Sequence, residues 1–290
     1  MTHGELLLGV DGGGTQCRAR LARRSGEVLG EGRAGPANLR LGIEESIAAA
    51  LDAAMQCFDA AGLSTQDFAR TVACLALAGA SEPGLLSRAR MQPLPFRRSL
   101  ATTDAHAACV GAHGGRDGGV VIVGTGTIGY GIVAGRHYRI GGWGWPISDE
   151  GSGAWLGCEA VRRALWAHDG HIGWTGLLRR VFEEFRRDPH EIVRCAATAR
   201  PADYGALAPL VVEHAVAEDA VAVELMRAAA AHVDALAARL AAFRVPAFSF
   251  VGGLAPHIEP WLPARTRRRA VLPDGDALAG ALRLAAREAE

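Results

Sequence analysis

Two glycine-rich stretches and a few carboxylates carry the chemistry in this sequence. Asp11 ends an apolar run and is followed by Gly12, Gly13, Gly14 and Thr15. Glycines let backbone N–H groups approach a ligand closely, and a carboxylate beside them can hold a cation. Residues 118–133 repeat this layout, with an apolar strand, a Gly/Thr tip and a returning strand. Each tip alone could be a simple turn, but two matching tips indicate binding of phosphate.

Any phosphate chemistry in this chain must work without lysine. The 31 basic residues are all arginine, so the lysines of P-loop proteins, Schiff-base enzymes and protein kinases are excluded. Asp104 follows an apolar strand and opens a helix, and Asp149 stands before another helix. Phosphoryl transfer to a sugar alcohol requires a metal ion, a base and a carboxylate that binds the sugar hydroxyl.

Several of these residues have a structural alternative. Asp104 stands where the N-cap of its helix would lie, Asn38 could be a turn residue, and Trp143 could be a core or interface aromatic. For Trp145 and Trp155 we favour the packing role.

Composition limits the class of protein. The chain is 49% hydrophobic and 21% charged, and its 31 basic residues balance 31 acidic ones, so no global field favours nucleic acid or a membrane. The six cysteines form no C-x-x-C pair and suit a reducing compartment. No signal peptide and no membrane-spanning stretch is expected, so we expect a cytoplasmic protein without membrane or nucleic-acid partners.

The elements that must position these residues form two hairpin-led α/β halves. We expect domains over residues 1–115 and 116–275, with a closing helix over 276–290 that could pack back on the first. Helical spacing over 43–62 places Ile47, Leu51, Met55 and Phe58 on one face. The remaining expectations are strands at 6–21, 26–35, 71–79, 247–256 and 264–273, and a long helix or close helix pair over 215–243. The Arg-rich strand at 264–273 is expected to be a solvated face.

Five motifs together resemble the N-acetylglucosamine kinase family, in the order found there: VDGGGTQCRA, TTDAHAA, VVIVGTGTIG, GGWGWPISDEGSGAWLG and FVGGLAP. The resemblance covers essentially the whole chain, and the GGWG…DEGSGAWLG block is its most specific part. The family belongs to the superfamily of sugar kinases, actin and heat-shock chaperone ATPases. It implies an α/β fold of two ribonuclease H-like domains with a nucleotide and sugar cleft between them.

The resemblance also implies roles for individual residues. Asp11 would hold Mg²⁺ through water, and Asp104 would be the catalytic base that accepts the sugar hydroxyl proton. The ATP-binding set would be Gly12, Gly13, Gly14, Thr15, Gly124, Thr125, Gly126, Thr127, Gly205, Gly252 and Gly253, with Gly205 the loosest match. The sugar-binding set would be Asn38, Asp104, Gly142, Trp143 and Asp149.

The expected function is therefore an ATP- and Mg²⁺-dependent kinase, acting as a homodimer on the 6-hydroxyl of N-acetylglucosamine or a related amino sugar. Ser148 stands before Asp149 where these kinases often carry glycine, and this departure lies in the loop beside the sugar. A glucosamine-specific kinase is therefore the alternative within catalysis. From another class, an activator ATPase of an acyl-CoA dehydratase-type partner would need cysteines that bridge an iron–sulfur cluster, and no cysteine lies at a glycine tip.

Overall fold

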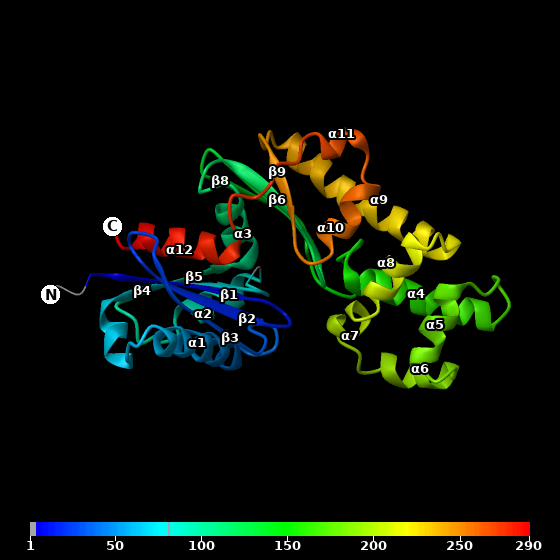
Figure 1. Ribbon diagram of the computed structural model, residues 1–290, viewed down its shortest axis with the longest axis horizontal. Coiled ribbons are helices and arrows are strands. Elements are labelled where there is room, and N and C mark those ends of the chain that lie inside the picture. The colour runs from blue at the N-terminus through cyan, green and yellow to red at the C-terminus, as the bar shows by residue number, and fades with distance from the viewer. Residues whose placement is uncertain (1–3, 81) are drawn as a thin grey trace. The chain divides into compact units, whose positions relative to one another are not determined.

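The computed structural model describes residues 4–80 and 82–290 (Figure 1). The chain divides into two compact units: the first comprises Met1–Gly118 and Leu272–Glu290, and the second comprises Gly119–Val271. The closing helix α12 (Ala277–Glu288) belongs to the first unit.

The first unit is built on a five-stranded sheet of order β3-β2-β1-β4-β5. β1 pairs antiparallel with β2 and parallel with β4, and β4 pairs parallel with β5. The strands are β1 (Leu6–Gly12), β2 (Cys17–Arg23), β3 (Val28–Ala34), β4 (Thr71–Leu77) and β5 (Arg98–Thr103). The remaining elements are α1 (Ile43–Ala60), the 3₁₀ helix η1 (Thr65–Arg70), α2 (Pro83–Arg90) and α3 (Asp104–Ala112).

Helices cover this sheet closely because small residues line the contacts. A Cβ on Gly30 or Gly32 of β3 would lie 2.2 or 2.0 Å from a carbonyl oxygen of α1, and one on Gly9 of β1 would lie 2.9 Å from a carbonyl oxygen of α12. The expected helix over 43–62 is confirmed, but its buried face differs from the expected one. Met55 is 44% exposed, and small residues including Ala50, Ala53 and Ala54 are buried, because a backbone so close to the sheet leaves little room for long side chains.

The second unit has a four-stranded sheet of order β8-β7-β6-β9, in which β6 and β9 run parallel. Its strands are β6 (Gly118–Val123), β7 (Thr127–Val133), β8 (Arg136–Gly141) and β9 (Phe248–Val251). Its helices are α4 (Gly153–His168), α5 (Gly176–Glu184), α6 (Pro189–Ala196), α7 (Pro201–Gly205), α8 (Ala208–Val216), α9 (Ala220–Ala242), α10 (Ala255–Ile258), the 3₁₀ helix η2 (Glu259–Trp261) and α11 (Ala264–Arg267). Of the two alternatives expected over 215–243, the long helix is confirmed: it is α9, and α8 ends at the start of that range.

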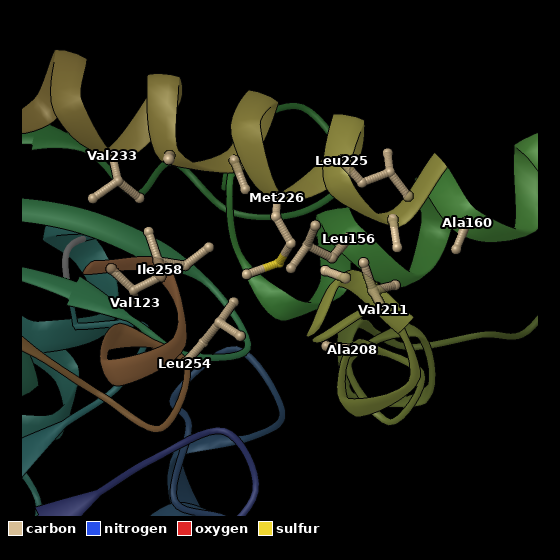
Figure 2. Packing of buried hydrophobic residues seen from close by; sticks show 14 of the residues in the cluster. Val123, Leu156, Ala160, Ala208, Val211, Leu225, Met226, Val233, Leu254 and Ile258 are labelled. Carbon is tan, nitrogen blue, oxygen red and sulfur yellow. The ribbon is translucent and has the colours of Figure 1, made fainter. Parts of the chain in front are cut away.

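The core of the second unit joins the sheet to its helices. Figure 2 shows Val123 of β6, Leu156 of α4, Met226 of α9 and Leu254 packed in one cluster. Helices α4, α5, α6, α8 and α9 therefore contribute to the same hydrophobic core as Val123, which directly precedes the second glycine tip.

The strand expected over 264–273 is wrong. Residues 264–267 form the short helix α11, which begins directly after Pro263, and only the isolated bridge from Ala270 to Phe248 has strand character. Thr266 is buried, and its hydroxyl donates to Asp234 of α9, while Arg265 forms an ion pair with the same carboxylate. These contacts to α9 favour a helical turn over an extended strand. The arginine side chain is exposed, as expected for a solvated face.

Candidate active site

In the first unit, the first glycine tip is the loop between β1 and β2. The Gly13 N–H donates to the Gln16 carbonyl at 2.9 Å, and the Ala37 N–H donates to the Gly13 carbonyl at 3.0 Å. A Cβ on Gly12 would lie 2.8 Å from Leu77 and 2.9 Å from Ala37, so no larger residue fits there. Gly14 and Thr15 are exposed at the tip. Backbone hydrogen bonds and close packing fix the base of the loop, and its tip is exposed to solvent.

Asp11 lies on β1 directly opposite Arg18 of β2. The Arg18 guanidinium donates to the Asp11 carboxylate at 2.6 Å, and the Asp11 side chain is 17% exposed. A half-buried carboxylate next to a glycine loop can hold a hydrated cation with one oxygen while the other accepts from arginine.

Asp104 lies at the same sheet edge as the glycine loop. Gly12, Leu77 and Thr103 are register partners across β1, β4 and β5, so the carboxyl ends of these parallel strands share one edge. Asp104 comes directly after this row, as the first residue of α3. Its Oδ1 accepts the N–H of Ala105 at 2.8 Å.

The expectation that Asp104 stands at the N-cap is wrong by one residue. Thr103 is the N-cap, and its hydroxyl accepts the N–H of His106 at 3.0 Å. Since a short hydroxyl side chain in extended conformation already satisfies that donor, the carboxylate of Asp104 is not required as the cap.

Asn38 belongs to this edge as well, within a turn. It bridges to Ala78, whose N–H donates to the Gly12 carbonyl at 2.7 Å. Its Oδ1 accepts the N–H of Arg40 at 3.1 Å, and its Nδ2 lies 3.7 Å from where a Cβ of Gly14 would be. Asn38 is thus both a turn residue and a neighbour of the loop. The first unit brings the carboxylates of Asp11 and Asp104, the first glycine loop and Asn38 to one edge.

In the second unit, the second glycine tip is attached to the start of α4. The N–H groups of Gly153 and Ala154 donate to the carbonyls of Gly124 and Thr125 at 2.8 and 3.2 Å. Thr127 is 3% exposed, and its hydroxyl donates to the Glu150 carbonyl at 2.7 Å, whereas Thr125 is exposed. The hydroxyl of Thr127 therefore holds the loop, whereas Thr125 is a solvent-exposed residue of the tip.

Asp149 lies beside this tip. Its Oδ2 is 3.0 Å from where a Cβ of Gly126 would be. Gly142 accepts a hydrogen bond from the Arg139 guanidinium through its carbonyl, and that guanidinium lies 4.0 Å from the centre of the Trp143 ring. Trp143 is 67% exposed and is not a core residue. Trp155, in contrast, packs against the hydrophobic core, as expected.

A cavity of about 590 Å³ opens in the second unit beside the second tip. Four of the expected nucleotide residues line it: Gly124, Thr125, Gly205 and Gly253. Gly252 lies next to it with φ +102°, and a Cβ there would lie 2.5 Å from the Val123 carbonyl oxygen, so this position requires glycine. The rest of the lining is Gly153, Ala208, Pro209, Val212, Glu213, Leu254 and His257.

Sequence reasoning missed the side chains of this lining. Glu213 is on α8 and His257 is on α10, far apart in the chain. No motif marks either residue, and they meet at one cavity because α8 and α10 pack in the same core. Of the two segments that carry these side chains, only the one with His257 adjoins a sequence motif, the glycine pair that precedes α10.

Within residues 4–80 and 82–290, no group of three or more His, Cys, Asp or Glu side chains is placed to hold a metal ion. Over the same residues, no helix is long and apolar enough to span a bilayer.

The similarity to known proteins extends over nearly the whole chain. A family model described as the BadF/BadG/BcrA/BcrD ATPase family matches residues 8–273. The chain is 38% identical over 278 residues to the glucosamine kinase GspK of Vibrio cholerae, a match that covers 96% of this chain and 95% of that protein. It is 30% identical over 190 residues to an N-acetylmuramic acid/N-acetylglucosamine kinase of Clostridium acetobutylicum, covering 64% of this chain and 61% of that protein.

A solved structure is also similar. The crystal structure of a candidate N-acetylglucosamine kinase of Chromobacterium violaceum superposes with a TM-score of 0.92 at 35% identity, covering 97% of this chain and 99% of that one. The α/β fold class with ribonuclease H-like domains, expected from the sequence, is thereby confirmed.

Proposed function

Because the chain belongs to the BadF/BadG/BcrA/BcrD ATPase family, we propose that it is an ATP-dependent kinase of glucosamine or N-acetylglucosamine. The observation that carries the nucleotide part is the cavity of about 590 Å³ lined by Gly124, Thr125, Gly205 and Gly253. The names of the two curated relatives, both amino sugar kinases, support the choice of substrate class.

The cavity suits a nucleoside in size and lining. Ligand pockets have volumes of roughly 300–1,000 Å³ and combine apolar walls with a few polar groups. Ala208, Val212 and Leu254 offer apolar contacts to a base, and Glu213 and His257 offer polar groups. The glycine tip next to them presents backbone N–H groups to phosphate without a lysine.

Asp11 is the proposed anchor for Mg²⁺. Mg²⁺ in kinase sites is held by one or two carboxylates together with waters and substrate phosphates. A carboxylate that is 17% exposed and adjoins a glycine loop fits this donor set. When bound, Mg²⁺ would offset the negative charge of the transferred phosphoryl group.

Asp104 is the proposed base. Its backbone is fixed as the first residue of α3, and its Oδ1 accepts the Ala105 N–H. The N-terminus of a helix favours negative charge, and a carboxylate in this place can accept a proton. It would take the proton of the sugar 6-hydroxyl as that oxygen attacks the γ-phosphorus, and ADP would leave.

The sugar itself would be held by Asn38, Gly142, Trp143 and Asp149. An exposed aromatic ring such as Trp143 offers a flat apolar face to a pyranose. Glucosamine is the first substrate to test, because the relative that matches 96% of this chain is named a glucosamine kinase.

An assay of ADP release with a panel of amino sugars tests the proposal. We expect ATP turnover that depends on glucosamine or N-acetylglucosamine and on Mg²⁺. Glucose and galactose serve as control sugars. If no amino sugar stimulates ADP release by folded protein that binds ATP, the proposed activity is wrong.

The activator alternative fits the cysteines poorly. Cys17 lies opposite Gly12 at the base of the first glycine loop, so one cysteine does adjoin a tip. It is fully buried, and burial is the main reason that its thiol pKa is raised to about 12. A buried thiol of this kind does not ionise readily to ligate iron. Purified protein that carries an iron–sulfur cluster would favour the activator instead.

The homodimer and the cytoplasmic location stay predictions. Light scattering coupled to size-exclusion chromatography would test the first, and cell fractionation would test the second.

A further inference from the structure

Charged residues form two rows across β1, β2 and β3. In the first row, Asp11, Arg18 and Arg33 are register partners, so their side chains lie on the same face of the sheet. In the second row, Arg20 is the partner of Glu31. Asp276, the N-cap of α12, lies over both rows.

Arg18 and Arg20 differ in their contacts to carboxylates and in their exposure. Arg20 contacts Glu31 at 2.6 Å and Asp276 at 3.4 Å, and its side chain is 23% exposed. Arg18 contacts Asp11 at 2.6 Å but reaches Asp276 only at 4.0 Å, and its side chain is 39% exposed.

The first row also places two like charges opposite each other. Arg18 and Arg33 are directly opposed on β2 and β3, an arrangement that is destabilising unless an anion lies nearby. The Arg18 guanidinium is a cation at any physiological pH. It lies one residue beyond the pair that closes the glycine loop, Gly12 and Cys17.

A triphosphate at this loop would need such a cation. The carboxylate of Asp11 and the phosphates would repel each other, and the chain has no lysine to offset the charge. A guanidinium has five N–H donors in a planar fork, which can serve a carboxylate and a phosphate together.

We propose that Arg18 binds the phosphate chain of the nucleotide while it pairs with Asp11. This inference rests on the proposed use of ATP by this chain. It adds a side chain that no glycine motif marks, and it assigns to arginine the charge that lysine supplies in P-loop proteins.

Calorimetric titration with MgATP and with adenosine tests the inference. Arg18→Gln is the main variant. Arg20→Gln is its matched control, because it lies on the same strand and face and is also ion-paired. We expect Arg18→Gln to weaken MgATP binding at least about tenfold, the loss of one charged hydrogen bond, and to leave adenosine binding unchanged. Arg20→Gln should change neither affinity.

Further variants and outcomes keep the inference falsifiable. Arg18→Lys should recover part of the MgATP affinity, because it keeps the charge but not the fork. If Arg18→Gln does not fold, Arg18→Met keeps the apolar stem and carries the same expectation. If Arg18→Gln leaves MgATP affinity unchanged, or weakens MgATP and adenosine binding equally, the role of Arg18 is overturned. The proposed function would still stand. If the unsubstituted chain binds no MgATP, the proposed function falls, and this inference falls with it.

Discussion

The substitution Asp104→Asn separates catalysis from helix capping at one position. Asparagine keeps an oxygen at the place where Oδ1 accepts the Ala105 N–H at 2.8 Å. It removes the negative charge and the ability to accept a proton. The N-cap of α3 is Thr103, whose hydroxyl accepts the His106 N–H. The variant therefore keeps the cap and loses only the carboxylate.

The capping role predicts a small loss of stability, whereas the catalytic role predicts a large loss of rate. The lost interaction of a charge with the first turn of a helix is worth about 0.3–1 kcal/mol in stability. General-base catalysis is worth about 10²–10⁴ in rate, or about 3–5 kcal/mol in the barrier. We therefore expect Asp104→Asn to lower turnover at least about a hundredfold while the melting temperature falls by less than about 4 °C.

The assay is ADP release with saturating amino sugar, with MgATP binding measured in parallel by calorimetry. Binding should be retained, because the carboxylate acts on the sugar hydroxyl. Thr103→Ala is the matched control: it removes the cap and should cost about 1 kcal/mol of stability. An Asn variant that turns over amino sugar at close to the unsubstituted rate would refute the role of Asp104 as base.

Two further substitutions test other parts of the site. Asp11→Asn should raise the Mg²⁺ concentration needed for half-maximal activity by about 10–100-fold, as expected for a residue that holds the ion through water; an unchanged Mg²⁺ requirement would contradict this role. Gly252→Ala should destabilise the protein to denaturant by about 1–3 kcal/mol, since φ is +102° and the new Cβ would lie 2.5 Å from the Val123 carbonyl. Gly253→Ala is its control, because a Cβ there meets nothing within 4 Å, and equal stability of the two variants would show that the close approach is relieved.

Local pattern was enough to predict most elements. The apolar runs that became β1, β4 and β6 have both faces buried or nearly so, and such strands appear in a sequence as continuous apolar stretches. The glycine tips were visible for the same reason, because turns that approach other backbone need glycine at defined positions. The family motifs then connected these tips to phosphate.

Positions that depend on one residue of register were predicted less well. Thr103 rather than Asp104 caps α3 because the helix begins one residue earlier than the pattern indicates, directly after the last residue of β5. Residues 264–267 are helical because Thr266 and Arg265 contact Asp234 of α9, a residue about 30 positions away in the chain. Local sequence carries no information about such a partner.

The sequence by itself determined which backbone segments could meet phosphate, and which carboxylates stood beside them. Only the tertiary structure decided which side chains lie beside them in the candidate site. The Asp11–Arg18 pair depends on the β1–β2 register, and the meeting of Glu213 with His257 at one cavity depends on the packing of α8 and α10. The physical reason is that turn conformation and hydrophobic periodicity are local properties of the chain, whereas side-chain neighbours are set by pairing and packing between distant segments.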